Sequence, residues 1–345
     1  MAKAITLRAG VIGCGKVART LHLAEYVNSD YTDLVAYCDV DSKSIAETVE
    51  RYGERPVYKD YRKMLAKERL DCVSVCTPNY LHCEVVLAAL EAGANVLVEK
   101  PMALTLKQAD AMIDTARRRK KVLMVSQTQR FSAVHQKAKE VIDSGMLGKI
   151  LHVTTAFGHP GPEGWSPRGK WFFQKEKAGF GPMADLGIHK ADLVRYLTGK
   201  EVRSVSAFTS REEKKRTDVE DNFVSVLRFT DDTLGTLTTS WTVKGMETNY
   251  TYLYCEKGTL AISVIPGRPL VAFMANPQCE IEFPVPAIQS NIEDTWQLGI
   301  VDNLAETILG KADCLVPGKE GRKALAIILA ADEAARTGKT VTVKK

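Results

Sequence analysis

Long apolar runs are missing from this sequence. None reaches about 18 residues, so no membrane-spanning helix is expected. The start of the chain lacks a basic segment followed by a long apolar stretch, so we expect no signal peptide. Cys-x-x-Cys pairs are missing too, and several of the eight cysteines lie inside apolar stretches. This pattern predicts free thiols in a reducing compartment, the cytoplasm.

A strong charge of one sign is also missing. The formal net charge is +5, the basic residues are scattered, and the one tight basic run, 117–121, is short. Such a run suits the end of a helix, where cations interact favourably with the helix dipole. A nucleic-acid-binding protein would need a larger basic face. We therefore expect neither a nucleic-acid nor a membrane partner.

The first third of the 345 residues alternates strand-like and helix-like stretches. Strand-like apolar runs lie at 7–12, 34–38, 57–58, 72–76, 95–98 and 122–125, with helix-like stretches at 16–29, 42–52, 61–67, 81–92 and 105–118. Buried runs separated by helices indicate a parallel sheet covered on both faces. We therefore predict a doubly wound α/β domain over residues 1–127.

The pattern changes after this point. Helix-like stretches at 134–144, 184–197, 295–309 and 320–337 accompany alternating strands at 150–157, 202–210, 223–229, 233–241, 250–255 and 259–264. Long alternating strands in succession indicate an antiparallel sheet. We therefore predict an α+β domain over residues 128–345, close to the two domains that the chain length suggests at about 150 residues each.

A glycine-rich loop follows the first strand, with the pattern Gly13-x-Gly15-x-x-Ala18. The first glycine allows a tight turn, the second lets the backbone approach a pyrophosphate, and the small third residue permits close packing. The predicted cofactor loop comprises Gly13, Cys14, Gly15, Lys16, Val17 and Ala18. A tight turn in another kind of α/β protein remains the alternative.

Asp39 ends the second strand, where a carboxylate can bind the adenosine ribose hydroxyls. It would repel a 2′-phosphate, and no arginine follows, so we predict NAD rather than NADP. Alternatively, Asp39 is a loop carboxylate that caps the next helix, a role that Asp41 or Ser42 could fill instead.

Two further segments lie at carboxyl ends of strands, where open α/β sheets bind ligands. The first contains Thr77, Pro78, Asn79 and His82, and the second contains Glu99, Lys100 and Pro101. A partly buried lysine beside a cationic nicotinamide could relay protons. An ordinary turn and an exposed lysine are the alternatives.

Asp185 and His189 are four residues apart on a predicted helix, with Asp192 three residues further. A histidine beside a carboxylate suits acid–base chemistry near neutral pH. Two alternatives stay open: a metal site made with Asp192, and a helix cap with a structural histidine.

Together, in this order, these motifs resemble the glucose-fructose oxidoreductase/inositol dehydrogenase/rhizopine-catabolism (Gfo/Idh/MocA) family. The resemblance covers nearly the whole chain and includes Cys255-Glu256-Lys257-Gly258-Thr259-Leu260. It implies a Rossmann domain, a second domain with a large open sheet that often forms the oligomer interface, and NAD(P)-dependent oxidation of a sugar or cyclic-polyol hydroxyl. The expected assembly is a homodimer or homotetramer through that sheet.

The resemblance also implies residue roles. Lys100 would assist proton transfer after a cis peptide to Pro101, His189 would be the acid–base, and Asp185 would bind substrate and tune both. The implied cofactor contacts are Thr77, Pro78, Asn79, His82, Glu99 and Gln129, and the implied substrate contacts are Lys100, Arg130, Arg168, Trp171, Asp185 and His189. Trp165 is a further candidate for the sugar pocket. No resident metal is expected.

The chain departs from the family at two points. It has Gly179-Phe180-Gly181 where three glycines are common, and Trp171-Phe172 where Trp-Arg is common. Two alternatives to the sugar or polyol dehydrogenase hypothesis remain: a catalytically silent NAD(P)-binding regulator and a reductase of a non-sugar carbonyl.

Overall fold

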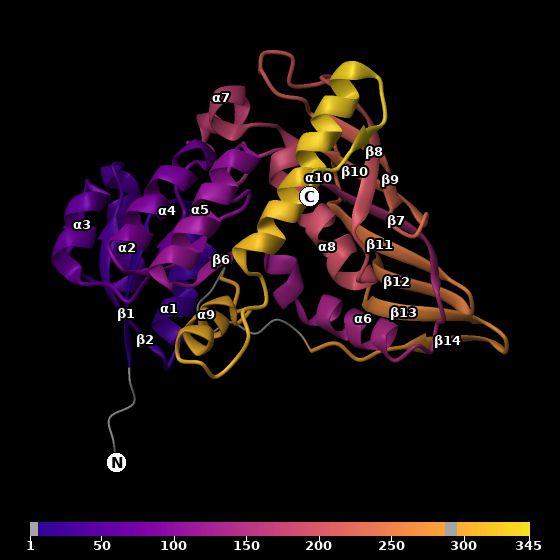
Figure 1. Cartoon of the computed structure of the whole chain (residues 1–345), viewed down its shortest axis with the longest axis horizontal. Helices are drawn as coiled ribbons and strands as arrows, with labels where there is room; N and C mark the ends of the chain where they lie inside the picture. The colour runs from indigo at the N-terminus through magenta and orange to yellow at the C-terminus, as the bar shows by residue number, and fades with distance from the viewer. Residues whose placement is uncertain (1–5, 287–294) are drawn as a thin grey trace. The chain divides into compact units, whose positions relative to one another are not determined.

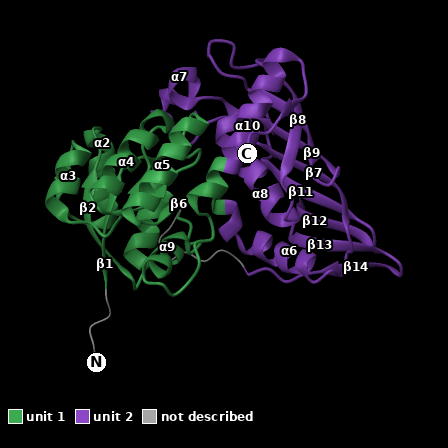
Figure 2. Cartoon of the chain, in the orientation of Figure 1, with its two compact units in different colours: residues 1–128, 288–322 green, residues 129–287, 323–345 purple. Residues whose placement is uncertain are grey.

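The computed structural model describes residues 6–286 and 295–345. The chain forms two compact units: the first contains residues 1–128 and 288–322, and the second contains residues 129–287 and 323–345 (Figure 2). This division differs from the two uninterrupted domains expected from the sequence. The chain leaves the first unit near the expected boundary, but a late segment returns to it.

The first unit is built on six parallel strands in the order β3-β2-β1-β4-β5-β6. The strands are β1 (Leu7–Ile12), β2 (Thr32–Cys38), β3 (Val57–Tyr58), β4 (Cys72–Val75), β5 (Asn95–Val98) and β6 (Leu123–Val125). The helices are η1 (Ala18–His22), α1 (Leu23–Asn28), α2 (Ser42–Tyr52), α3 (Tyr61–Glu68), η2 (Asn79–Leu81), α4 (His82–Glu91), α5 (Leu106–Arg119) and α9 (Ile300–Ile308). Every residue of β4 and β5 is buried, as a sheet covered on both faces requires. The predicted doubly wound parallel sheet is confirmed.

The returning segment is fixed to the first unit by Glu25 of α1. Its carboxylate accepts hydrogen bonds from the backbone N–H groups of Leu298, Gly299 and Val301, at 2.7, 3.1 and 2.7 Å. These contacts hold the chain ahead of α9 in a non-helical path, so the helix expected from residue 295 begins only at Ile300. The prediction of its first five residues was wrong because a distant carboxylate binds their backbone.

The second unit contains a nine-stranded sheet in the order β14-β13-β12-β11-β7-β10-β9-β8-β15. Its strands are β7 (Ile150–Gly158), β8 (Val202–Ser210), β9 (Asn222–Phe229), β10 (Leu234–Ser240), β11 (Thr248–Cys255), β12 (Gly258–Ile265), β13 (Arg268–Ala275), β14 (Gln278–Glu282) and β15 (Val341–Thr342). Its helices are η3 (Thr128–Phe131), α6 (Ala133–Asp143), η4 (Lys170–Phe173), α7 (Lys175–Ala178), η5 (Met183–Gly187), α8 (Ile188–Thr198) and most of α10 (Gly318–Thr337). Only β7 and β10 pair in parallel. The mainly antiparallel sheet is confirmed, although β13, β14 and β15 were not predicted.

The two faces of this sheet differ. In Figure 1, α6, α8 and α10 lie along one face, and that face carries buried side chains such as Val153, Leu227 and Leu237. The opposite face follows the alternate positions of the same strands and is exposed. Its large apolar side chains are Phe208, Val224, Val226, Leu234 and Tyr254.

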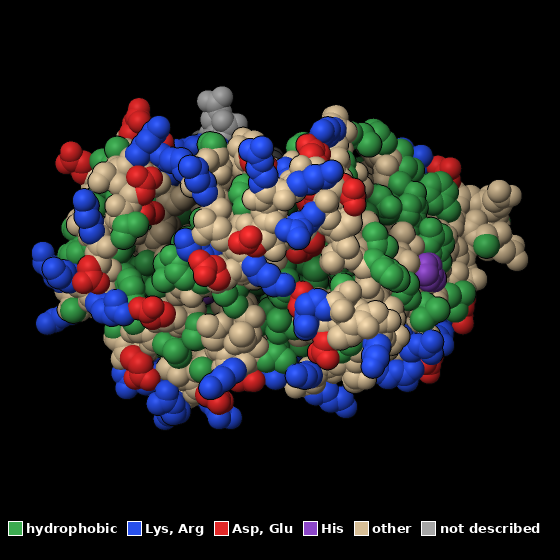
Figure 3. Space-filling model, turned by 90° about the horizontal axis from the view of Figure 1, so that it is seen from above, with side chains coloured by type: hydrophobic (Ala, Val, Ile, Leu, Met, Phe, Trp, Pro, Cys, Tyr) green, Lys and Arg blue, Asp and Glu red, His purple; other side chains and the backbone are tan. Residues whose placement is uncertain are grey.

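Charged side chains of both signs are interspersed over the surface drawn in Figure 3, rather than gathered by sign. Within the described residues, no helix is both long enough and apolar enough to cross a membrane.

Candidate functional site

The glycine-rich loop joins β1 to the helix that begins η1. Gly13 has a φ of +92°, and a Cβ there would lie 2.5 Å from the carbonyl oxygen of Cys76. Only glycine therefore fits between the ends of β1 and β4. A Cβ on Gly15 would meet nothing within 4 Å, so open space lies beside this backbone. Ala18 is fully buried, as close helix–sheet packing requires.

Asp39 at the end of β2 is bound to the same loop. Its Oδ2 accepts a hydrogen bond from the Cys14 N–H at 2.6 Å, and its Oδ1 accepts one from the Asp41 N–H at 2.8 Å. The helix cap proposed as its alternative role belongs to Asp41, whose carboxylate binds Lys43 and Ser44 of α2. The two hydrogen bonds fix a carboxylate beside the glycine loop.

The carboxyl ends of β4 and β5 are joined by His82. One ring nitrogen lies 2.7 Å from the Thr77 carbonyl oxygen and the other 2.9 Å from that of Pro101. His82 is fully buried, so it braces these two loops from inside rather than facing a ligand. The Lys100–Pro101 peptide is cis, as the resemblance implied, and Lys100 is half-buried.

Glu99 belongs to a buried polar chain that the sequence did not reveal. His22 Nε2 donates to Glu99 Oε1 at 2.8 Å, and His22 Nδ1 lies 2.9 Å from Ser74 Oγ. Tyr26 Oη continues the chain, 3.0 Å from Ser74 Oγ. Burial alone would raise the pKa of Glu99, but the hydrogen bond and charge of His22 lower it to about 2. A buried negative charge therefore precedes Lys100.

Buried polar atoms without partners remain at this edge of the sheet. Among the described residues, no hydrogen-bonding partner is found for Thr77 Oγ1 or for either polar atom of the Gln127 side chain. Unsatisfied buried groups of this kind are costly and point to a bound molecule or water. With the open space at Gly15, they fit a dinucleotide laid along the carboxyl ends of the strands. Gln127 was not among the predicted residues.

Asp185 and His189 lie in the second unit, where the π-helical turn η5 leads into α8. Both are buried, with exposed fractions of 6% and 8%. The ring of Phe157, from β7, lies 6.3 Å from that of His189 and 6.2 Å from that of His159. A π-helical turn widens the spacing of the helix and often marks a functional site.

Two side chains that were not predicted contact Asp185. Trp241 Nε1 donates to Asp185 Oδ2 at 3.0 Å, and His159 Nε2 lies 3.3 Å from the same oxygen. Trp241 follows β10 and is fully buried, while His159 follows β7. Neither belongs to a recognisable sequence motif, because only the packing of β7 and β10 against η5 brings them to Asp185.

The helix with Asp185 begins at a tight contact. A Cβ on Gly181 would lie 2.0 Å from the Glu220 carbonyl oxygen, which explains this glycine of the Gly179-Phe180-Gly181 segment. Glu220 Oε1 accepts the Met183 N–H at 3.1 Å and so caps the helix. Burial raises the pKa of Glu220 to about 7. The cap expected of Asp185 is thus made by another residue.

Arg130 and Asp192 form a buried ion pair. Arg130 donates to both Asp192 oxygens at 2.7 Å, and its guanidinium lies over the Tyr196 ring. Both Asp192 oxygens are engaged by this ion pair, so Asp192 is held by Arg130. The substrate contact expected of Arg130 stays a prediction. Gln129 Nε2 lies 3.4 Å from Asn249 Oδ1, within the second unit. Among the residues that the structure describes, no group of acidic, histidine and cysteine side chains is arranged to hold a metal.

Lys190, next to His189, is fully buried. Its Nζ lies 3.4 Å from the Tyr250 carbonyl oxygen and over the Phe157 ring. Burial lowers the pKa of Lys190 to about 7. No sequence motif distinguishes this lysine from an exposed one.

The other expected substrate residues lie in the segment after β7. Trp171 stacks on Phe172 with ring centroids 3.9 Å apart, and Trp165 meets Phe172 edge-on at 5.2 Å. Phe172 packs against the cluster that contains Trp241. Trp165 and Trp171 are half-buried and Arg168 is exposed. The aromatic group thus reaches the packing around Asp185.

Comparison with known proteins identifies relatives of both units. Residues 7–127 match the family described as "Oxidoreductase family, NAD-binding Rossmann fold", and residues 135–261 match "GFO/IDH/MocA C-terminal domain". The chain is 41% identical over 204 residues to D-glucoside 3-dehydrogenase of Escherichia coli K12; the match covers 58% of this chain and 57% of that enzyme. It is 31% identical over 240 residues to myo-inositol 2-dehydrogenase of Thermotoga maritima, with 68% of each chain covered.

A solved structure with the same fold is aldose-aldose oxidoreductase of Caulobacter crescentus, crystallised with glycerol. It superposes with a TM-score of 0.83 and 27% identity, and the match covers 98% of this chain and 99% of that chain. The two family matches lie in both units of the chain, and the superposition covers nearly its whole length. The chain therefore belongs to the Gfo/Idh/MocA family of oxidoreductases.

Proposed function

We propose that this protein is an NAD-dependent dehydrogenase or reductase that acts on a hydroxyl-bearing carbon of a sugar, glycoside or cyclic polyol. One observation carries the proposal: the carboxyl edge of the parallel sheet collects Gly13, Asp39 and Lys100 around unsatisfied buried polar atoms. Ligands of open α/β sheets bind at this edge. The named activities of the matched dehydrogenases support the substrate class.

Asp39 accounts for the preference for NAD over NADP. Its carboxylate is already held by two backbone N–H groups, so its charge is fixed at the end of β2. Fixed negative charge accepts hydrogen bonds from ribose hydroxyls and repels a 2′-phosphate. Asp39→Asn should therefore lower the ratio of the NADPH dissociation constant to the NADH dissociation constant. Fluorescence titration measures both constants. An unchanged ratio would contradict the role of Asp39.

The cofactor loop would comprise the residues from Gly13 to Ala18. Its glycines allow the approach of the pyrophosphate, and the helix that follows directs its N-terminal N–H groups to the phosphates. Thr77, Pro78, Asn79, Glu99 and Gln129 complete the proposed contacts, with His82 acting through the loops it braces. A bound nicotinamide coenzyme would supply the acceptor or donor of the hydride.

In this reaction, side chains of the protein accept or donate the proton of the substrate hydroxyl. In the oxidative direction the carbinol carbon loses a hydride and its oxygen loses a proton. Lys100 and His189 are the residues proposed to receive or return that proton, and Asp185 is proposed to hydrogen-bond the substrate. The buried Glu99 charge lies beside the Lys100 backbone, since Glu99 Oε2 accepts the Lys100 N–H at 3.2 Å. This bond orients the strand end that presents Lys100.

Trp165, Arg168 and Trp171 are proposed to shape the substrate pocket. A flat aromatic face suits the C–H surface of a sugar ring, and an exposed guanidinium can bind hydroxyl or carboxylate groups. This segment is held against the Trp241 cluster by Phe172. Trp171→Ala should raise KM more than it lowers kcat.

The outer face of the nine-stranded sheet is proposed as the interface of a homodimer or homotetramer. Phe208 is 77% exposed there, next to Val224 and Val226 on the neighbouring strand. A contiguous exposed apolar face is typical of an interaction site. The eight free cysteines fit a cytoplasmic location.

The test is an absorbance assay at the NADH band with aldoses, glycosides, inositols and sugar acids, each with NAD and NADP. Lys100→Met should abolish turnover while NADH still binds, whereas the exposed Lys107→Met should behave like the wild type. Near-normal turnover by Lys100→Met would refute its role. Tight NADH binding without turnover would favour a regulatory protein, and turnover confined to non-sugar carbonyls would favour the third hypothesis.

A further inference from the structure

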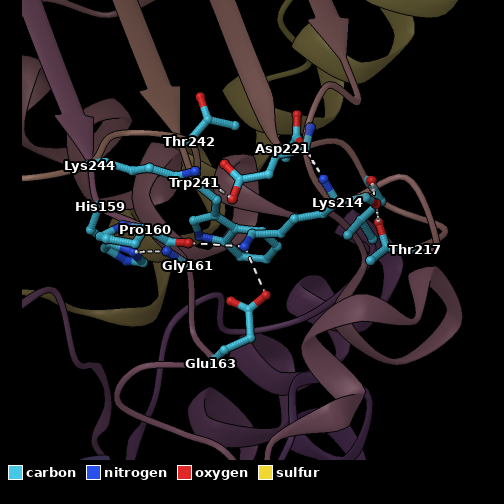
Figure 4. Close-up of polar contacts among 12 residues, drawn as sticks. His159, Pro160, Gly161, Glu163, Lys214, Thr217, Asp221, Trp241, Thr242 and Lys244 are labelled. Carbon is cyan, nitrogen blue, oxygen red and sulfur yellow. Dashed lines mark hydrogen bonds and ion pairs between the residues drawn. The ribbon is translucent and has the colours of Figure 1, made fainter.

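Two loops of the second unit close around the contacts of Asp185. One follows β7 and contains His159, and the other joins β8 to β9 and contains Lys214 and Asp221 (Figure 4). Neither loop contains a sequence motif of the family. Their hydrogen bonds lead, by separate routes, to the two side chains that contact Asp185.

His159 is held in one orientation. Its backbone N–H donates to the Ser240 carbonyl oxygen at 3.0 Å, and its Nδ1 accepts the Gly161 N–H at 2.9 Å. Because Nδ1 is an acceptor, the proton of the neutral ring lies on Nε2. Nε2 is therefore the donor that faces Asp185 Oδ2 at 3.3 Å.

Lys214 fastens the His159 loop. Its Nζ donates to the Pro160 carbonyl oxygen at 3.0 Å and to Glu163 Oε1 at 2.8 Å, so it binds the chain on both sides of Gly161 (Figure 4). The Lys214 side chain is only 9% exposed. Gly161 has a φ of +112°, and a Cβ there would lie 2.6 Å from Lys214 Cε. The contact is thus closely packed as well as charged.

Asp221 fastens the Lys214 loop in turn. Its carboxylate accepts the backbone N–H groups of Glu212, Glu213 and Lys214. Its own carbonyl oxygen accepts the Trp241 N–H at 2.8 Å. One residue therefore links the turn that presents Lys214 to the indole that donates to Asp185.

We propose that His159 is a positioning residue for Asp185 and that Lys214 acts through His159 by clamping its loop. Two donors on one carboxylate oxygen leave a single orientation of the group, which a precise substrate contact requires. This proposal rests on the proposed function in one respect only, the use of Asp185 on the substrate. The arrangement of Asp185, His159 and Trp241 is independent of it.

Besides His159, which contacts Asp185, other titratable groups lie on the helix that carries Asp185 or cap its start. His159 follows β7, His189 and Lys190 lie on α8, and Glu220 caps the start of the Asp185 helix. The glutamate and the lysine are common to every variant below. Differences among the variants therefore report on the His159 contact.

The Trp241 indole N–H provides a direct readout that needs no substrate. In protein labelled with ¹⁵N-tryptophan, one of four indole resonances is assigned by Trp241→Phe and followed with pH. His159→Phe removes the second donor, so the Trp241 resonance should titrate at a pH higher by about 1 unit, because a carboxylate that loses a hydrogen bond is protonated more readily. His159→Gln, which keeps an N–H donor, should restore part of the difference. An unshifted titration in a folded His159→Phe protein would overturn the positioning role.

Lys214→Met tests the clamp, with Lys214→Arg as the conservative variant and the exposed Lys215→Met as the matched control. Lys214→Met should move the Trp241 titration in the same direction, Lys214→Arg should largely restore it, and Lys215→Met should leave it unchanged. In the His159→Phe background, Lys214→Met should add little, because the clamp acts through the histidine. Full additivity of the two changes would overturn the proposed route.

Kinetics then separate this proposal from the proposed function. If Asp185 acts on the substrate, His159→Phe should lower kcat about tenfold. It should also move the acid limb of the pH–rate profile to higher pH, because the carboxylate is then protonated more readily. Shifted indole titrations in a protein that turns over no sugar or polyol would refute the proposed function and support the positioning of Asp185. Normal turnover and an unmoved pH profile in a variant with a shifted indole titration would refute a role for His159 in catalysis.

Discussion

The buried pair of His22 and Glu99 offers a quantitative test of the first unit. The His22 side chain is fully buried and that of Glu99 is 10% exposed, with 2.8 Å between their charged atoms. The perturbation is His22→Leu, which keeps most of the side-chain volume but removes the partner of the carboxylate. Because this pair lies within the first unit, neither substrate nor cofactor is needed to measure the effect.

The magnitude follows from the pKa of Glu99. Burial raises this pKa, but the hydrogen bond and charge of His22, together with Lys100 and Ser126, more than offset burial, so the pKa falls from 4.5 to about 2. At 1.36 kcal/mol per unit of pKa, the ionised carboxylate contributes about 3 kcal/mol to the free energy of unfolding. A folded-state pKa below the unfolded value means that this contribution is present above pH 4.5. It is lost as the pH falls toward 2.

Removing His22 reverses the sign of this dependence. Burial then acts on Glu99 without its main offset, and its pKa should rise above the unfolded value. Breaking one side of a buried pair costs about 3–5 kcal/mol, or a fall in Tm of roughly 4–7 °C at about 2.1 cal/mol/K per residue over 345 residues. Adding Glu99→Gln to His22→Leu should recover much of the loss, because the buried charge is gone.

The assay is thermal unfolding followed by circular dichroism, without cofactor, between pH 4 and pH 8. Relative to the double variant, His22→Leu should gain stability as the pH falls from 7 toward 5, because protonation removes the buried charge. The reasoning would be refuted if Glu99→Gln gave no recovery, or if the stability of His22→Leu relative to the double variant did not change with pH.

Four further predictions concern single positions. Gly13→Ala should lower Tm and abolish NADH binding, because its Cβ would lie 2.5 Å from the Cys76 carbonyl oxygen at a φ of +92°. Gly15→Ala should leave Tm unchanged, since its Cβ meets only open space, but it should weaken NADH binding. Melting curves and fluorescence titration distinguish the Gly13 variant from the Gly15 variant. Equal Tm values for the two variants would contradict the argument. Lys190→Met should raise Tm most below pH 7 and progressively less toward pH 10. Burial lowers the pKa of Lys190 to about 7, so the free-energy cost of burying its charge declines as the pH rises above this value. A pH-independent gain would count against a buried charge. Phe208→Asp should convert a dimer or tetramer to a smaller species in light scattering after size exclusion, and an unchanged mass would exclude this face as the interface.

Local pattern was sufficient for most elements of the fold. The strands Leu7–Ile12, Asn95–Val98 and Val202–Ser210 and the helix Ser42–Tyr52 have the bounds that the sequence predicts. Apolar runs, alternation and caps such as Asp41 act within a few residues, so they can be recognised without knowing the fold. The strand β13 was missed, where Pro269 interrupts the pattern, and the short strands β14 and β15 were missed as well.

Functional motifs were visible for the same reason where one segment contains them. The glycine loop needs its special backbone at Gly13. Asp185 and His189, the proposed acid–base pair, are four residues apart on one helical stretch. Pairings between distant segments were not visible. Glu99 meets His22 and Asp192 meets Arg130 only because the elements pack together.

The sequence by itself determined the two sheets, the cofactor loop and the family, because each depends on short-range spacing and residue type. Only the tertiary structure decided how these groups are held. It placed Trp241 and His159 on Asp185, assigned Arg130 to an ion pair, and returned residues 288–322 to the first unit. Such contacts join segments far apart in the chain, and hydrogen-bond geometry and burial become defined only when the strands and helices pack.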